Sequence, residues 1–345
     1  MSWPTTKAPL CRRGSAALPH DAAGRGSRLA IAVACIAASA LSLRVDAATA
    51  PDYSQQLDAL WSFDRPALSE QRFRAEAAKH APRSREAVEA ATQIARAQGL
   101  QRKFGDADLT LHAVQATLDA QPARVRVRYL LERGRRDNSS ERRTSAIAWF
   151  EQALAASAND TLPGASYYRV DALHMLAIAS PAEQQLEWNK RAIAAAQSSD
   201  DARTRRWRTS LFNNIGWTMH DRGDFVAALD YWRQALAAAE QDGQDATRTR
   251  IGRWTVARGL RSLGRLDEAE AMQRALADEL QAAQVPDGYV FEELAEIAVA
   301  RGDRAAARPW AAKALELLRN DADFVATQPE RLARLADLAE PGPPR

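Results

Sequence analysis

The feature that most constrains this chain is a small residue that recurs at a nearly fixed interval. Each time it follows a turn and lies in an amphipathic helical stretch, and it occupies Ala107, Ala146, Ala228, Ala269 and Ala307. The steps are 39, 82, 41 and 38 residues, and the longest spans two intervals because a further, shorter pair of helical stretches lies inside it. Such spacing in an all-helical pattern predicts stacked pairs of helices that share one continuous core.

The stretch FNNIGWTMHDRGDFVAALDYWRQAL, residues 212–236, shows the repeating unit most clearly. Three- and four-residue steps place one apolar stripe on a first helix and another on a second helix, with DRGD between them. Gly223 can adopt the left-handed conformation that ends a helix. Gly216 and Ala228 are small where the two helices would cross closely, and Trp232 is predicted to fill the space beside them.

This unit resembles the tetratricopeptide repeat (TPR) family, whose pattern is W-x2-L-G-x2-Y, then G-x-[YF], then A-x3-F-x2-A. The matching residues are Phe212, Ile215, Gly216, Met219, Gly223, Phe225, Ala228, Trp232 and Ala235. The units at 250–280 and 288–318 match well, the one at 88–118 fairly, and those near 128–155 and 170–195 weakly. Departures include Arg102 in place of the turn glycine, Arg133 in place of a leucine, and a period above the family's usual ~34 residues.

The resemblance implies an all-α, right-handed superhelical solenoid of helix-turn-helix (TPR-like) repeats. We expect a signal peptide over 1–47, an N-terminal helical segment over 48–84, and an array of about six helix pairs over 85–318. Residues 319–345 are expected to form a capping helix and a tail. The segment PERLARLADLAE carries leucines along one stripe, so it would cover the exposed apolar face of the last pair.

The N-terminal residues have the pattern of a secretory leader. Arg25 and Arg28 precede an apolar run, and Val45 and Ala47 stand as a signal peptidase requires. The run is about 15 residues, shorter than the roughly 20 that span a bilayer. We therefore expect the periplasm or secretion, and no stable membrane span after cleavage. An uncleaved membrane anchor and a cytoplasmic protein whose leader is not used remain as alternatives.

Charge and cysteine content narrow the function classes. The chain carries a formal net charge of +3, but residues 1–47 hold six basic and two acidic side chains, which leaves 41 basic and 42 acidic ones beyond them. The basic footprint of a nucleic-acid-binding protein is therefore absent from the mature chain. Both cysteines, Cys11 and Cys35, also lie in the leader, so the mature chain has no disulfide or cysteine metal site.

The resemblance further implies which residues face a partner, because the first helix of each pair lines the concave groove of TPR proteins. The predicted groove residues are Asn213, Asn214, Trp217, His220, Trp254, Arg258, Arg261, Tyr289, Glu292 and Glu296, with Gln93, Arg96, Arg135, Asn138 and His174 in earlier units. Asparagine can donate and accept hydrogen bonds along a peptide backbone, arginine can take a carboxylate with two N–H groups, and tryptophan offers a rigid anchor. The other interpretation is a solvated polar face whose side chains bond one another.

No pattern for catalysis accompanies these residues. His220 and Asp221 are adjacent on a helix and point about 100° apart, so they do not form a pair. Neither G-x-S-x-G nor H-E-x-x-H occurs, and no glycine-rich phosphate loop follows the leader. A metal site of His174, His220 and Asp171 is conceivable between neighbouring helices, but we predict no metal and no cofactor.

One basic run, RTRRWR over 203–208, allows two interpretations. It could bind an acidic partner segment or anionic lipid headgroups, or it could be a helical linker whose arginines pair with nearby acids, which we favour. The sequence as a whole predicts a non-enzymatic scaffold or adaptor that binds a protein or peptide in the groove. A self-assembling structural protein of the cell envelope and a sensor of a small ligand are the alternatives.

Overall fold

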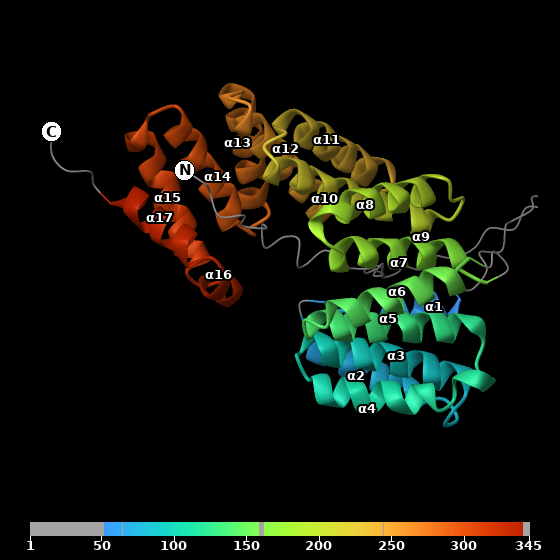
Figure 1. Ribbon diagram of the computed structural model, residues 1–345. Coiled ribbons are helices and arrows are strands. Elements are labelled where there is room, and N and C mark those ends of the chain that lie inside the picture. Colours follow the sequence, from blue (N-terminus) through green and yellow to red (C-terminus); the bar gives the residue numbers. More distant parts are fainter. Residues whose placement is uncertain (1–51, 64, 159–161, 244, 341–345) are drawn as a thin grey trace, which may run out of the picture. The chain divides into compact units, whose positions relative to one another are not determined.

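The computed structural model describes residues 52–63, 65–158, 162–243 and 245–340, and this part of the chain is helical throughout, with short connections (Figure 1). The predicted all-α class is therefore confirmed for the described residues. The predicted signal peptide over 1–47 lies outside them.

The helices follow one another as antiparallel pairs. Two helices come first, α1 (Tyr53–Asp58) and α2 (Pro66–Ala77). The pairs are α3 (Arg85–Leu100) with α4 (Phe104–Gln115), α5 (Ala123–Ser139) with α6 (Arg143–Ala156), α7 (Ala165–Ala179) with α8 (Ala182–Gln197), α10 (Trp207–Asp221) with α11 (Phe225–Gln241), α12 (Ala246–Ser262) with α13 (Leu266–Ala282), and α14 (Gly288–Ala300) with α15 (Arg304–Leu318). Short helices η2 (Leu118–Ala120) and α9 (Ala202–Arg205) lie between pairs, and α16 (Ala322–Thr327) and α17 (Pro329–Ala339) follow them.

The chain divides into two compact units whose boundary lies within α5, between Val125 and Arg126. In the N-terminal unit, Leu57 and Phe73 are fully buried beneath the ring of Trp61, which stacks on Phe63 at a centroid distance of 4.5 Å. The Trp61 indole N–H donates to Gln93 Oε1 at 3.2 Å, so α3 is joined to this cluster by a polar contact as well.

In the C-terminal unit, the packing predicted for the repeat is present. A Cβ atom at Gly216 would lie 2.4 Å from the indole of Trp232, so only glycine lets α10 and α11 approach this closely. Trp232 and Ala228 are fully buried beside it. Gly134 has the same role, since a Cβ there would lie 2.3 Å from the ring of Phe150. The predicted fit between glycine and aromatic ring is confirmed, and it extends to a weakly matching unit.

A left-handed residue follows the first helix of each pair except α7, which is followed by the extended Ser180. Gly223, in the predicted turn, has a φ of 78°. Arg102, which replaces the turn glycine of the family pattern, adopts the same conformation with a φ of 61°. The geometry of the turn is thus kept although a non-glycine residue is strained there by about 1 kcal/mol.

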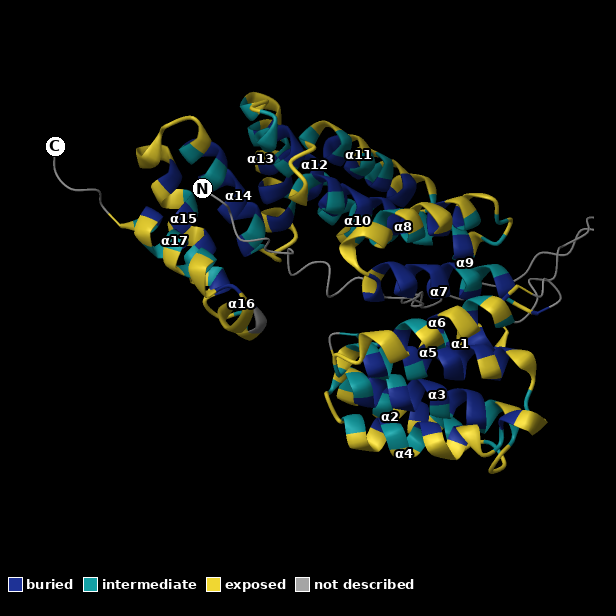
Figure 2. Cartoon of the chain, viewed as in Figure 1, coloured by how far each residue is buried: buried dark blue, intermediate teal, exposed yellow. Residues whose placement is uncertain are grey.

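After the last pair, α17 packs against α15 and buries Leu335 and Leu338. Figure 2 shows how buried residues follow the sides on which helices meet, while exposed residues follow the opposite sides. In a repeat array this pattern leaves one side of each first helix to carry polar residues without disturbing the core.

Candidate functional site

The candidate site is the side of α10, α12 and α14 that carries the predicted groove residues, and we call it the inner face. On α10 its stripe begins at the first residue of the helix, because Trp207, Ser210, Asn214 and Trp217 recur at three- and four-residue steps. Asn213 and Asn214 are half-buried. Within the part of the chain that the structure describes, the Asn213 side chain makes no hydrogen bond, so its amide is open to a partner.

The two predicted tryptophan anchors are largely buried. Trp217 is 6% exposed and lies edge-on to Trp232 with 5.0 Å between ring centroids. Trp254 is 3% exposed, and its indole N–H donates to the carbonyl oxygen of Tyr289 at 3.0 Å. Both rings therefore support the inner face from below rather than project from it. Trp207 is the half-buried indole on the α10 stripe. The helical spacing that relates Trp207 to Asn214 and Trp217 could have identified it as a residue of this face, but the sequence analysis assigned it to a linker.

His220 lies at the end of the α10 stripe and is hydrogen-bonded to its neighbour helix. Its Nε2 is 2.9 Å from the Ser262 hydroxyl oxygen. Burial, with the nearby guanidiniums of Arg258 and Arg261, lowers the pKa of His220 to about 4. The imidazole is therefore neutral near pH 7, and it serves this site as a hydrogen-bonding group rather than a charge.

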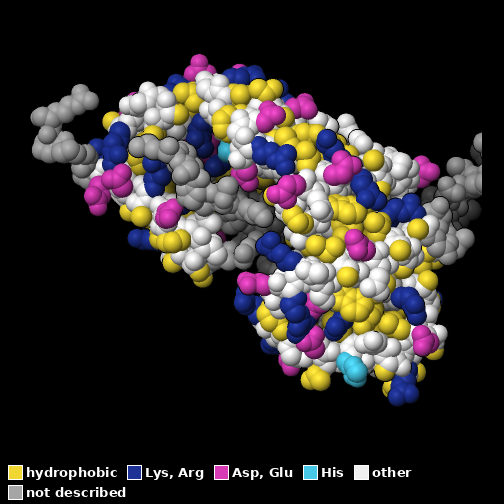
Figure 3. Space-filling view, in the orientation of Figure 1, with side chains coloured by type: hydrophobic (Ala, Val, Ile, Leu, Met, Phe, Trp, Pro, Cys, Tyr) yellow, Lys and Arg dark blue, Asp and Glu magenta, His cyan; other side chains and the backbone are white. Residues whose placement is uncertain are grey.

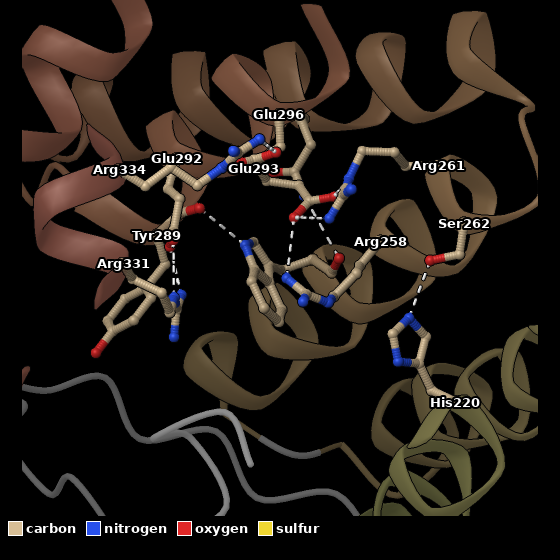
Figure 4. A network of polar contacts seen from close by, with 12 residues as sticks. His220, Arg258, Arg261, Ser262, Tyr289, Glu292, Glu293, Glu296, Arg331 and Arg334 are labelled. Carbon is tan, nitrogen blue, oxygen red and sulfur yellow. Dashed lines mark hydrogen bonds and ion pairs between the residues drawn. The ribbon is translucent and has the colours of Figure 1, made fainter. Parts of the chain in front are cut away.

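On α12, the two predicted arginines already share a carboxylate (Figure 4). Arg261 Nε donates to Glu293 at 2.5 Å, and Arg258 Nη1 donates to the same carboxylate at 3.3 Å. The Glu293 side chain is 1% exposed. Burial alone would raise the pKa of Glu293, but the two guanidiniums outweigh it and lower that pKa. The sequence singled out both arginines and missed Glu293, their partner.

The acidic end of the predicted groove is neutralised by the last helix. Arg331 of α17 pairs with Glu292, and Arg334 pairs with Glu296 (Figure 4). The Arg331 guanidinium also lies over the ring of Tyr289, 5.7 Å from its centroid. Burial and the charge of Asp321 raise the pKa of Tyr289 to about 12, so its hydroxyl stays protonated. The inner face of α12 and α14 is thus bonded within the array.

The earlier predicted residues are held in local contacts too. Arg135 of α5 pairs with Glu132 and with Asp171 of α7. The His174 ring lies 5.1 Å from the ring of Trp207, and Asn138 is half-buried. In the N-terminal unit, Gln93 accepts from Trp61, and the Arg96 guanidinium lies 5.3 Å from the Trp61 ring centroid.

No metal centre is formed by the residues that the structure describes, since they contain no group of three or more His, Cys, Asp or Glu side chains placed to hold an ion. Two arginines of the basic run over 203–208 are used internally, although the run is not only a linker, because α10 begins at Trp207. Arg205 Nη1 donates to the carbonyl oxygens of Ser199 and Asp200, and Arg208 pairs with Asp242 at 2.7 Å. On the face shown in Figure 3, basic and acidic side chains are interspersed.

A separate hollow of about 500 Å³ opens to solvent between α8, α10 and α11. Its walls include Ile193, Phe212 and Tyr231, with Lys190 and Asp230 among its polar groups. It shares no residue with the predicted groove. The inner face of α10 offers the Asn213 amide and the half-buried ring of Trp207, so we take the inner face and not the hollow as the candidate site.

Comparison with solved structures finds BtubC (BKLC) from P. vanneervenii, which is 19% identical, with a TM-score of 0.51 over 65% of this chain and 92% of that chain. NprR in complex with its cognate peptide NprX is 13% identical, with a TM-score of 0.49 over 84% of this chain and 83% of that chain. A tetratricopeptide repeat protein from Parabacteroides merdae ATCC 43184 is 13% identical, with a TM-score of 0.45 over 83% and 98% of the two chains. No family model and no curated protein sequence matches.

Identities this low bear on the fold alone. Among the described residues, no helix has the length and apolar content needed to cross a membrane. The chain folds as an array of antiparallel TPR-like helix pairs, and its structural neighbours are TPR repeat proteins of low sequence identity.

Proposed function

We propose that this chain is a protein- or peptide-binding scaffold that holds an extended segment along the inner face of α10, without catalysis. One observation carries the proposal. Ion pairs join α5 to α7, α12 to α14, and α14 to α17, whereas α10 is joined to α12 by hydrogen bonds of His220 with Ser262 and of Arg248 with Ser210. The inner face of α10 also offers the open amide of Asn213 and the half-buried ring of Trp207.

The chemistry of the inner face of α10 suits an extended backbone. An asparagine side chain can donate to a peptide carbonyl and accept from a peptide N–H at the same time. Trp207 supplies apolar area at low entropy cost for one partner side chain. Arg258 lies next to this face, with its guanidinium 5.4 Å from the Trp217 ring centroid, and it adds unused N–H donors.

Export is part of the proposal, and it rests on the leader pattern of 1–47. An oxidising compartment suits a mature chain without cysteine, and the partner would then be another exported protein or an envelope component. Mass spectrometry of the protein recovered from its native cell would show a mature chain that begins near Ala48. A full-length mass would contradict cleavage.

The test of binding is affinity capture with the chain from Ala48 as bait in an envelope extract. The comparison is with an Asn213→Ala/Trp207→Ala variant of the same chain. Asn320→Ala is the matched control, because Asn320 is exposed at the end of α15 and bonds only to the Glu316 carbonyl oxygen. We expect a partner that the parent and the control retain and the double variant loses.

Equal captures by all three baits would contradict binding on α10. Light scattering of the purified parent addresses the self-assembly alternative, because an obligate assembly would keep one oligomeric mass at every concentration. If all baits held the same partner and the parent kept one oligomeric mass at every concentration, the protein would be an obligate assembly whose partner does not bind on the inner face.

A further inference from the structure

We propose that Glu293 determines the charge of the partner group that this inner face accepts: one negative charge, taken by Arg258. The inference rests on the proposed function and names the chemistry of the segment that binds. The three residues involved lie together on neighbouring first helices, Arg258 and Arg261 on α12 and Glu293 on α14.

The two arginines make different numbers of hydrogen bonds to Glu293. Arg261 gives two N–H groups to Glu293, from Nε and from Nη2 at 3.3 Å, so the carboxylate fills the position that a partner's carboxylate would take on it. Arg258 gives only Nη1 to Glu293. Its Nε is buried without a hydrogen bond, and its side chain keeps 24% of its area exposed, against 19% for Arg261. Arg258 therefore gives fewer of its N–H groups to Glu293 than Arg261 does and keeps more of them for a partner.

Two indoles fix the direction of Arg258. Its guanidinium lies 5.4 Å from the ring centroid of Trp217 and 5.6 Å from that of Trp254. The two centroids are 6.2 Å apart, so the guanidinium lies against a contacting pair of rings, and this contact limits its rotation. The buried indole N–H of Trp217 makes no hydrogen bond among the described residues and adds a second unsatisfied donor beside it.

Charge then limits what can bind. Two guanidiniums and one carboxylate leave a single excess positive charge. Burial is the main cause of the lowered pKa of His220, and Arg258 and Arg261 lower this pKa further. One carboxylate on Arg258 neutralises that excess. A second negative charge would lie against Glu293 without a cation of its own, and like charges in contact are strongly disfavoured at an interface.

The test uses a displayed library of random ten-residue peptides, selected separately on the parent and on Glu293→Gln. Glutamine keeps the shape of glutamate and leaves two uncompensated guanidiniums, so we expect its selected peptides to contain more Asp and Glu than those of the parent. A peptide with two adjacent acidic residues should bind Glu293→Gln about tenfold more tightly than the parent.

Two further variants keep the test decisive. Glu279→Gln is the matched control, since Glu279 also pairs with two arginines of α12, Arg250 and Arg253, but away from the inner face. It should select the same peptides as the parent. Glu293→Gln/Arg261→Gln returns the excess to one charge, and it should recover the parent's preference even if Glu293→Gln alone folds poorly.

The outcomes separate the two proposals. Peptides selected by the parent and lost by Asn213→Ala/Trp207→Ala, with an unchanged acidic content on Glu293→Gln, would overturn the role of Glu293 and leave the proposed function standing. No selection on any of the proteins would contradict the proposed function, and the role of Glu293 would fall with it.

Discussion

The inner faces of α10 and of α14 have the same place in their repeats and a different chemistry. On α14, Glu292, Glu293 and Glu296 are each bound by an arginine of a neighbouring helix. On α10, Asn213 is half-buried and without a hydrogen bond among the described residues. Helix α14 uses all three glutamates to hold its neighbours, whereas α10 bonds to α12 through His220 and keeps Asn213 free. In such an array, the first helices with fewer internal bonds are the better candidates for recognition.

The largest expected effect comes from breaking the ion pairs on the inner face of α12 and α14, which we call the bonded side; the inner face of α10 is the open side. Glu293→Gln leaves two guanidiniums without a carboxylate in a site where Glu293 is 1% exposed, and we expect a loss of about 3 kcal/mol in the free energy of unfolding. Urea unfolding followed by circular dichroism measures it. A loss below about 1 kcal/mol would show that the bonded side does not hold α12 and α14 together, and the contrast with α10 would fail.

A second effect is a pH dependence of stability that comes from His220, which lies on α10 and bonds to α12. The folded pKa of His220 is about 4, against an unfolded value of about 6.5, so the unfolded chain binds more protons between these values. Its contribution to stability is complete above pH 6.5 and is lost as the pH falls towards 4. We expect His220→Gln to flatten the pH dependence of the melting temperature in this range. An unchanged slope would show that His220 is solvated.

A smaller effect is expected at the edge of the bonded side. Arg334 is 40% exposed, so its pair with Glu296 is screened by solvent, and Glu296→Gln should cost less than about 1 kcal/mol. Raising the salt concentration should reduce the difference between this variant and the parent. A cost equal to that of Glu293→Gln would contradict the distinction between the buried pair and the exposed pair.

The smallest effect on stability is expected on the open side. Asn213→Ala removes an amide that makes no hydrogen bond, so the unfolding free energy should change by about 0.5 kcal/mol or less. Thermal melting beside the parent is sufficient to measure this. A larger loss would mean that Asn213 is structural, and that its substitution cannot report on binding alone.

The sequence predicted what depends on neighbours a few residues apart. Gly216 and Trp232 could be paired because the family pattern and helical spacing place them at one crossing, and the structure confirms the fit. The left-handed residue after α10 also follows from local chemistry, because Gly223 adopts it without strain.

Contacts between repeats were beyond sequence reasoning. Arg261 and Glu293 are 32 residues apart, and their pairing depends on the stagger of two helices that no local pattern specifies. Trp217 and Trp254 were predicted to line the groove because helical phase gives a direction from the axis. Helical phase does not show whether a neighbouring helix packs over a side chain that points in this direction, and in the structure both rings are buried. Trp207 was missed because the arginines around it indicated a linker, whereas α10 begins there.

The central claim, that a partner binds on the inner face of α10, is tested most directly by hydrogen–deuterium exchange of the parent with a peptide selected from the library. We expect slower exchange in α10 and in the facing part of α12 when the peptide is bound. Protection confined to α8 and α11, which line the separate hollow together with α10, would contradict the claim and place the partner there instead.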